Sequence, residues 1–360
     1  KAKKPPINIG KLERFAADFE SINELRKPKK IKQDLGKVAV VGSGPAGLSV
    51  AGDVAKLGYE VTVFEGQSEP GGVLLFGIPE FRLSKAVVRR EIARLEGLGV
   101  KFVCNTFIGQ DKTLDDLFAE GYDSIFIGTG THIPQDVRME NDEVPGVFQA
   151  MYLLTNVQLV ENGELDENQI PVKKGDRVII IGGGNVAMDA ARTCVRLGCE
   201  SVTVAYRRSQ EQMPALLSEY EEARAEGVQF QWFASPVGVE GKDKVEGFKY
   251  EVMALNEDGA GIHGTGNFQV MPVDKIIIAA GHKPNARLIG EGNNLKVDEK
   301  GYIITSEDPY GMTNRDGVFA GGDVVHKPAT VVLAMREAKK AVDGMVKYME
   351  IKKAQESANQ

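Results

Sequence analysis

Short apolar runs that end at a glycine recur along the chain and predict buried parallel strands. They include KVAVVG starting at Lys37, SIFIGTG ending at Gly130 and DKIIIAAG ending at Gly281. A run that is apolar at nearly every position is typical of a strand covered on both faces of a parallel sheet. Helix-forming stretches alternate with these runs, so the pattern predicts an α/β fold.

Two glycine turns of the same design each join a predicted strand to a predicted helix. In the first turn the strand Val38–Val41 meets Gly42, Gly44 and Gly47. In this pattern the first glycine allows a tight turn, the second lets a pyrophosphate approach the backbone, and the third lets the helix pack on the strand. The N-terminus of the helix then offers free amide groups to the phosphates.

The second turn carries Gly182, Gly184 and Ala187 at the corresponding positions. Glycines also form ordinary turns, and one match alone is weak evidence. Two matches, each between a strand and a helix inside a unit of roughly 30 residues, favour two Rossmann-like dinucleotide-binding domains.

The residues after the second strand of each unit differ in charge. Glu65 follows the strand Val61–Phe64, where its carboxylate is suited to the ribose hydroxyls of FAD or NAD. Arg207 and Arg208 come shortly after the strand Ser201–Ala205. Guanidinium groups bind the 2′-phosphate of NADP(H), which a carboxylate would repel. The alternative is that these are ordinary surface charges; the pattern favours FAD at the first turn and NADP(H) at the second.

Composition narrows the function classes. The chain has 360 residues, 42% of them hydrophobic, which predicts a globular protein of two or three domains. Its net charge of −7 disfavours nucleic acid and anionic membranes as partners. Neither a signal peptide nor an apolar run near membrane-spanning length is visible, so we expect a cytoplasmic protein.

The cysteines and histidines do not suggest a metal site. Cys104, Cys194 and Cys199 are too few for a four-cysteine iron–sulfur or zinc site. Cys194 and Cys199 lie near the end of a predicted helix, where their spacing would place the side chains roughly 140° apart. We therefore expect a structural role for this pair rather than a redox disulfide. The histidines are scattered, without metal-ligand spacing.

The order of the segments predicts that the second dinucleotide-binding domain is inserted into the first. The segment Gly146–Leu159 is expected to be helical and to lead into the second unit. After the second unit, a strand at Gly317–Ala320 delivers Gly321, Gly322 and Asp323, and a helix is expected from near Ala329. The predicted parts are an N-terminal arm (1–35), a FAD-binding domain in two parts (36–145 and 283–348), an NADP(H)-binding domain (146–282) and a C-terminal tail (349–360).

Several longer motifs carry a family resemblance over Ile7–Lys347. They are INIGKLERFAADF, VGSGPAGL, EPGGVLLFGIPEFRL, IIGGGNVAMDAART, AYRRSQEQMP and GVFAGGDVV. With them the chain resembles the glutamate synthase small (beta) subunit family, whose relatives include the NADPH-binding subunit of NADH-dependent ferredoxin:NADP oxidoreductase, part of dihydropyrimidine dehydrogenase and, more remotely, adrenodoxin reductase. The run Gly71–Pro79 sets the chain apart from glutathione reductase-like and thioredoxin reductase-like proteins.

The resemblance implies a set of cofactor-binding positions. They comprise the pyrophosphate loop, the ribose ligand, the segment along the flavin, a backbone contact to the adenine, the ribityl ligand and the helix aimed at the flavin ring. The FAD positions are Gly42, Ser43, Gly44, Pro45, Ala46, Gly47, Glu65, Gly72, Leu75, Gly77, Ile78, Ile108, Gly322, Asp323, Thr330, Val331 and Val332. The NADP(H) positions are Gly182, Gly184, Asn185, Val186, Arg207, Arg208 and Glu219.

The expected activity is an NADPH-dependent flavoprotein oxidoreductase of the glutamate synthase small-subunit type. The cofactors would supply the chemistry, so no catalytic side chain is expected. Family members usually carry an upstream domain with two [4Fe–4S] clusters; INIGKLERF resembles the end of that domain, and we expect this chain to be a fragment without it. The electrons would pass to those clusters or to a partner, such as the glutamate synthase large subunit or a ferredoxin-linked flavoprotein subunit.

Three alternatives remain open from the sequence. The first is the NADPH-binding subunit of an electron-bifurcating ferredoxin:NADP oxidoreductase, which uses the same cofactors at the same turns. The second is a non-catalytic module that binds flavin and senses NADP(H). The third, a disulfide reductase, is disfavoured because no cysteine pair occurs near the first turn.

Overall fold

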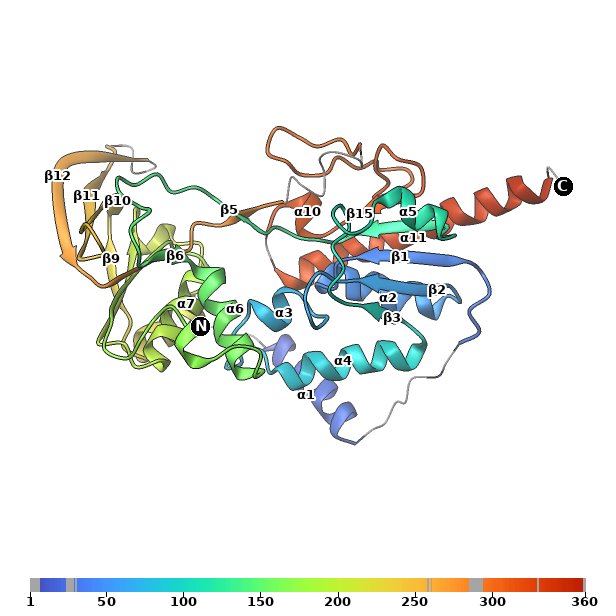
Figure 1. Ribbon diagram of the computed structural model, residues 1–360, viewed down its shortest axis with the longest axis horizontal. Helices are drawn as coiled ribbons and strands as arrows, with labels where there is room; N and C mark the ends of the chain where they lie inside the picture. The colour runs from blue at the N-terminus through green and yellow to red at the C-terminus, as the bar shows by residue number, and fades with distance from the viewer. Residues whose placement is uncertain are drawn as a thin grey trace, which may run out of the picture.

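The protein consists of two units, each built around a five-stranded parallel sheet (Figure 1). This computed structural model describes residues 7–23, 29, 31–257, 259, 261–284, 294–328 and 330–358. The α/β fold with two Rossmann-like sheets is therefore as expected from the sequence.

The first unit is assembled from segments on both sides of the second. Its sheet has the strand order β15-β4-β1-β2-β3. Because β15 pairs in parallel with β4, chain that follows the second unit completes the first sheet. The strands are β1 (Lys37–Val41), β2 (Glu60–Phe64), β3 (Lys101–Val103), β4 (Ser124–Ile127) and β15 (Val318–Ala320). The helices are α2 (Pro45–Lys56), α3 (Val73–Phe76), α4 (Lys85–Leu98), α5 (Leu114–Ala119), α10 (Asp323–His326) and α11 (Val331–Ala358).

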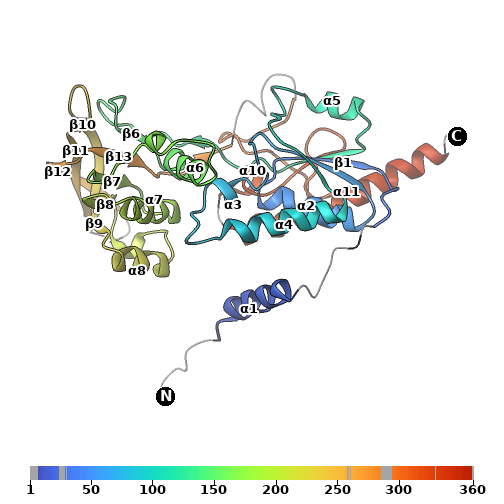
Figure 2. The same cartoon turned by 60° about the horizontal axis from the view of Figure 1, so that its bottom comes forward.

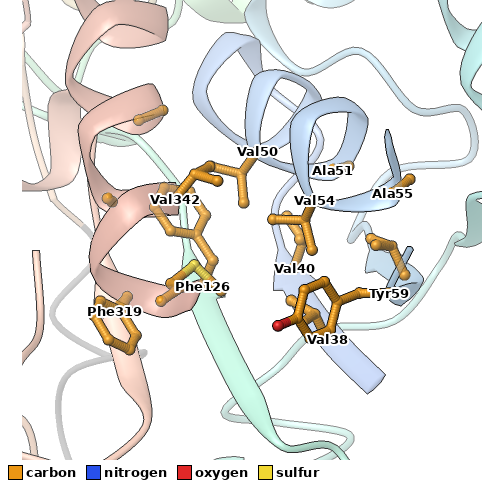
Figure 3. Packing of buried hydrophobic residues seen from close by; sticks show 14 of the residues in the cluster. Val38, Val40, Val50, Ala51, Val54, Ala55, Tyr59, Phe126, Phe319 and Val342 are labelled. Atoms are coloured by element: carbon orange, nitrogen blue, oxygen red, sulfur yellow. The ribbon is translucent and has the colours of Figure 1, made fainter. Parts of the chain in front are cut away.

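The core of the first unit lies between its sheet and the packed helices α2 and α11 (Figure 3). Val50 and Val54 of α2 are one helical turn apart and face Val40 of β1 and Val342 of α11. Side chains of this size contribute about 1.5–3 kcal/mol each when fully buried. This packing fixes α2, and with it the first glycine turn, against the ends of β1 and β4.

The second unit repeats the arrangement with the strand order β6-β13-β7-β8-β9. Its strands are β6 (Val147–Gln149), β7 (Arg177–Ile181), β8 (Ser201–Tyr206), β9 (Gln229–Trp232) and β13 (Lys275–Ile278). Its helices are α6 (Ala150–Glu161), α7 (Asn185–Arg196) and α8 (Leu217–Ala225), with short 3-10 turns at Glu167–Gln169 and Gln210–Gln212. The expectation of a helix over Gly146–Leu159 was wrong at its start, because Val147–Gln149 pairs with β13 as an edge strand.

Two smaller sheets lie outside the parallel sheets. A three-stranded antiparallel sheet joins β10 (Ala234–Glu240), β11 (Gly247–Leu255) and β12 (Ile262–Pro272), and the sequence reasoning did not anticipate it. The short strands β5 (Ile133–Pro134) and β14 (His282–Lys283) pair antiparallel. They lie where the chain leaves the first unit and where it returns, so they connect the two units.

The helices at the two ends of the chain differ in how they pack. The helix α1 (Ile9–Ile22) buries none of its residues and lies apart from the body of the protein (Figure 2). The helix α11 continues through Ala358, so residues 349–358, expected as a tail, extend this helix. Ala329, near which its start was expected, lies outside the described residues. Among the described residues no helix combines the length and apolar character needed to cross a membrane, and the cytoplasmic location stays a prediction.

Cys194 and Cys199 lie closer together than the helix geometry suggested. The helix α7 ends at Arg196, and Gly198 adopts a left-handed φ of 83° that turns the chain back. The amide of Cys199 then donates to the carbonyl of Cys194 at 3.3 Å, as in a Schellman helix end. A hydrogen bond to Cys199, together with burial, raises the pKa of the Cys194 thiol. Both thiols are free, and the expected angular separation was wrong because the helix ends between them.

Candidate functional site

The first glycine turn contains two glycines that the fold requires and one that it does not. Gly42 has a φ of 92°, and a Cβ there would lie 2.9 Å from the carbonyl oxygen of Gly128. A Cβ on Gly47 would lie 1.9 Å from the carbonyl oxygen of Gly42. Gly44 precedes α2 with a φ of −68°, and a Cβ there would meet no atom within 4 Å. The protein alone therefore gives no reason for glycine at position 44, whereas a ligand against the backbone would.

The second glycine turn repeats this pattern. Gly182 has a φ of 144°, and a Cβ there would lie 2.4 Å from the carbonyl oxygen of Ala279. Gly184 precedes α7 with a φ of −92°, and a Cβ there would again meet nothing within 4 Å. Ala187 at the third position is fully buried, so the second turn accommodates a Cβ where the first turn has Gly47. Both turns thus leave open space at a helix N-terminus, which suits a pyrophosphate.

Glu65 lies beneath the first turn, where Ser43 holds its carboxylate in place. Its Oε2 accepts the amide of Ser43 at 3.0 Å and also the hydroxyl of Ser43. Its Oε1 accepts the amide of Gln67 at 2.9 Å. Two carboxylate oxygens can accept about four hydrogen bonds, so one more donor, such as a ribose hydroxyl, can be accommodated.

Two distant segments meet the first turn and complete a candidate flavin site. A Cβ on Gly72 would lie 2.9 Å from the Cα of Gly44, and one on Gly322 would lie 2.8 Å from the Cβ of Ala46. The backbone therefore approaches the turn closely from both sides. Asp323 begins α10 directly after Gly322, and a cavity of about 240 Å³ lies between α10 and the start of α11.

The other predicted FAD positions lie around this junction. Leu75 and Ile108 have buried side chains, so only their backbone can face a ligand. The segment before Ile108 runs beside Glu65, because the amide of Thr106 donates to the carbonyl of Glu65 at 2.9 Å. The hydroxyl of Thr330 accepts the amide of Leu333 at 3.2 Å, so Thr330 caps a helix that begins at Val331. The remaining members of the set are Pro45 at the start of α2, Gly77 and Ile78 just after α3, and the exposed Val332 of α11.

The loop after β8 folds back over the second turn. The ring of Tyr206 lies over Gly183, where a Cβ would be 2.6 Å from the ring. The amide of Ala215 donates to the carbonyl of Gly183 at 3.0 Å, and the amide of Leu216 donates to the side chain of Asn185 at 3.0 Å. These contacts hold the loop that carries the two predicted arginines beside the turn.

Arg207 and Arg208 are both exposed at this turn. In the described part of the chain, no carboxylate forms an ion pair with either guanidinium. Val186 lies in the first turn of α7, next to the open position at Gly184. The second turn therefore combines a helix N-terminus with two available cations, an arrangement that suits a phosphorylated dinucleotide.

Glu219 forms ion pairs with two arginines of the protein, whereas the resemblance implies that it contacts NADP(H). Its Oε1 lies 2.9 Å from Arg82 of the first unit, and its Oε2 lies 3.7 Å from Arg192. Arg82 also binds both carboxylate oxygens of Asp189 on α7. Burial raises the pKa of Asp189 to about 6, against the opposing effect of Arg82.

Sequence reasoning missed Arg82, Asp189 and the buried Lys85. Arg82 lies inside the motif GIPEFRL and Asp189 inside GGGNVAMDAA, but no pattern in the sequence pairs residues so far apart. The amine of Lys85 donates to the carbonyl of Leu74 at 2.9 Å and to the carbonyl of Ile78. Lys85 thus binds two carbonyls of the segment predicted to lie along the flavin.

Replacing Lys85 with Met should lower the free energy of unfolding by about 1–3 kcal/mol, because two buried carbonyls lose their donor. Burial lowers the pKa of Lys85 to about 8, below the 10.5 of an unhindered lysine. The folded state then binds fewer protons than the unfolded state between these values, so the contribution of Lys85 to stability rises with pH. Urea unfolding should show a wider gap between wild type and Lys85→Met at pH 10 than at pH 7.

The exposed Lys101→Met variant is the control for this prediction, because the amine of Lys101 lies at the surface of the same unit in an ion pair with Glu60 that contributes only about 0–1 kcal/mol. It should unfold like the wild type at pH 7. A Lys85→Met protein as stable as wild type at both pH values would show that the amine does not hold the segment.

Two units with these paired sheets and open glycine turns define a protein that binds two dinucleotides. Residues 36–338 match the family described as pyridine nucleotide-disulphide oxidoreductase. The chain belongs to this family and, within it, to the glutamate synthase small-chain group.

Curated relatives support the narrower group. The chain is 37% identical over 357 residues to "Glutamate synthase [NADPH] small chain" of Escherichia coli K12, covering 96% of this chain and 75% of the relative. It is 33% identical to the protein of the same name in Azospirillum brasilense, covering 96% and 73%. It is also 36% identical to "NADP(+)-dependent formate dehydrogenase subunit beta" of Moorella thermoacetica, but covers only 44% of that protein.

Solved structures share the fold at lower identity. Mycobacterium tuberculosis FprA in complex with NADPH is 20% identical, with a TM-score of 0.74 over 90% of this chain and 86% of that one. Lactococcus lactis thioredoxin reductase is 23% identical, with a TM-score of 0.66 over 87% and 99%. The expected resemblance, fold class and enzyme class of an NADPH-dependent flavoprotein oxidoreductase are confirmed at the level of this family.

Proposed function

We propose that this chain is a FAD-dependent NADPH oxidoreductase of the glutamate synthase small-subunit type. One observation carries the proposal: two turns of matching geometry, each open at its second glycine, end beside opposite charges. Glu65 lies at the first turn, and Arg207 and Arg208 lie at the second. When both cofactors are bound, the nicotinamide supplies a hydride and the flavin accepts it.

The chain's own residues position and stabilise the cofactors. The N-termini of α2 and α7 direct backbone amides at the two pyrophosphates. The carboxylate of Glu65 accepts a ribose hydroxyl, while Arg207 and Arg208 bind the 2′-phosphate. The capped N-terminus of α11, starting at Val331, directs positive helix dipole toward negative charge on the flavin. None of these roles requires a side chain to gain or lose a proton.

The division into a FAD-binding domain of residues 36–145 and 283–348 around an NADP(H)-binding domain of residues 146–282 forms part of the proposal. The pairing of β15 with β4 supports it. The assignment of Glu219 to NADP(H) is retained in a narrower form. Its Oε1 is paired with Arg82 and its Oε2 is buried 3.7 Å from Arg192, so Glu219 would hold α8 in place beside NADP(H) rather than contact the cofactor directly.

We further propose that electrons leave the flavin for iron–sulfur centres outside the described residues. Relatives are named as a glutamate synthase small chain and a formate dehydrogenase beta subunit, which suggests that this chain too works as one subunit of a complex. The first candidate partner is a glutamate synthase large subunit. The second is the flavoprotein subunit of a bifurcating ferredoxin:NADP oxidoreductase.

NADPH turnover with each candidate partner tests the proposed electron acceptor. The FAD-loaded protein should sustain NADPH oxidation when the large subunit, glutamine and 2-oxoglutarate are added. Turnover only with ferredoxin, NAD and the flavoprotein subunit would assign the chain to the bifurcating enzyme instead. No turnover with either partner, from a flavin that NADPH still reduces, would contradict both assignments.

A non-catalytic sensor of NADP(H) is a weaker candidate. Such a module binds flavin and NADP(H) but transfers no hydride between them, so its flavin-facing segment need not be held in a fixed position. Here Lys85 holds that segment and Gly72 brings it within contact of the first turn. A fixed segment favours hydride transfer, which needs a defined separation between the two cofactors.

A further inference from the structure

A two-residue projection of the first unit, Phe81 and Arg82, inserts between helices of the second unit. The Nη1 of Arg82 donates to both oxygens of Asp189, at 2.9 and 2.8 Å. Its Nη2 lies 2.9 Å from Glu219 of α8. One guanidinium of the flavin-side unit therefore ties together two helices of the other unit.

Phe81 is held beside Arg82 by stacked arginines. The guanidinium groups of Arg192 and Arg196 lie 4.6 and 4.2 Å from the centroid of the Phe81 ring. Arg192 is fixed in turn by Glu226 at 2.7 Å and by Glu222 at 2.7 Å. The cation–π attraction between these arginines and the Phe81 ring adds to the ion pairs of Arg82. Together they hold the projection against α7 and α8.

The position of these contacts connects both cofactor turns. Asp189 lies one helical turn after Asn185, so it is on the helix whose N-terminus forms the second glycine turn. On the other side, Lys85 ties the carbonyls of Leu74 and Ile78 to α4. The segment from Leu74 to Lys85 is thus anchored in the flavin unit at both ends and contacts the NADP(H) unit between them, through Phe81 and Arg82.

The contact between Arg82 and Asp189 is well suited to fixing the separation of the two units. The side chain of Asp189 is 6% exposed and that of Arg82 is 22% exposed, so water competes little with the contact. The guanidinium places Nη1 on Asp189 and Nη2 on Glu219, so one planar group fixes two carboxylates at once, which the single amine of a lysine cannot reproduce. A misplacement of about 1 Å between reacting groups can cost about a hundredfold in rate.

We propose that Arg82 is a positioning residue that sets the NADP(H) unit against the flavin-facing segment by binding Asp189 and Glu219. The proposal rests on the proposed function, because it assigns Arg82 a role in that hydride transfer. It makes Arg82 important for the rate of flavin reduction rather than for the affinity of either cofactor.

The test is anaerobic stopped-flow reduction of the FAD-loaded full chain by NADPH. In Arg82→Lys the limiting rate should fall by about tenfold or more, while the dissociation constant for NADPH stays within about twofold. Asp189→Asn should act in the same direction, and the double variant should be no slower than the slower single variant. The matched control is Arg177→Lys, which alters a bidentate pair with Asp274 inside the second unit.

A second readout needs no bound cofactor. In the cofactor-free chain, amide hydrogen exchange over residues 73–82 should be about tenfold faster in Arg82→Lys and unchanged in Arg177→Lys. Unchanged exchange, or a limiting rate within twofold of wild type in both Arg82→Lys and Asp189→Asn, would overturn the proposal. If the variants lose FAD, the exchange result decides. If NADPH fails to reduce the wild-type flavin, the proposed function fails, and the exchange result still decides whether Arg82 joins the units.

Discussion

Replacing Gly44 with Ala should weaken FAD binding by about a hundredfold or more, about 3 kcal/mol, without destabilising the cofactor-free chain. The added Cβ would meet no protein atom within 4 Å, and the backbone already has a φ that any residue adopts. The methyl group would occupy only the space through which the pyrophosphate approaches. Calorimetric titration with FAD and thermal unfolding of the cofactor-free protein measure the two effects separately.

Gly47→Ala is the matched contrast in the same turn. Its Cβ would lie 1.9 Å from the carbonyl oxygen of Gly42, so this variant should unfold at a lower temperature even without cofactor. Gly184→Ala should weaken NADP(H) and leave FAD affinity unchanged, because it alters only the second turn. Wild-type FAD affinity in Gly44→Ala would mean that the pyrophosphate does not bind at this glycine.

Replacing both Arg207 and Arg208 with Ala should weaken NADPH by about a hundredfold while changing NADH affinity by less than about threefold. Each guanidinium–phosphate hydrogen bond contributes about 1.5–3 kcal/mol, and only NADPH carries the 2′-phosphate. Both side chains are exposed, so their removal should leave the fold intact. Binding of NADP(H) and NAD(H) by fluorescence titration measures the ratio.

The control for this variant is Arg138→Ala, which removes an arginine that is 96% exposed and lies on another loop. It should leave both affinities unchanged. An NADPH-to-NADH preference that survives the double replacement would refute the assignment of the second turn to NADP(H).

The parallel strands could be predicted because they are apolar at nearly every position. The runs at Val38–Val41 and Ser201–Ala205 are buried on both faces, so their composition reflects their surroundings. The antiparallel sheet escaped prediction because β12 is exposed along most of its length and carries no apolar alternation. The strand β6 escaped because it is short and runs directly into α6.

Some residues of the candidate site could likewise be predicted from the sequence, and others could not. The glycines and the charges that follow each second strand are local in sequence, and their spacing reflects a backbone requirement. The contact between Arg82 and Asp189 joins residues 107 positions apart, so it depends on how the two units pack. The burial of Lys85 could not be predicted either, because a lone lysine at the start of a helix is expected at the surface.

NADPH bound at the second turn is expected to reduce FAD bound at the first. Anaerobic addition of NADPH to the purified, FAD-loaded chain tests it most directly through the visible absorbance of the flavin. NADPH should bleach the yellow colour, and NADH should do so far less effectively. A chain that cannot be reconstituted with FAD, or a bound flavin that dithionite bleaches but NADPH leaves yellow, would contradict it.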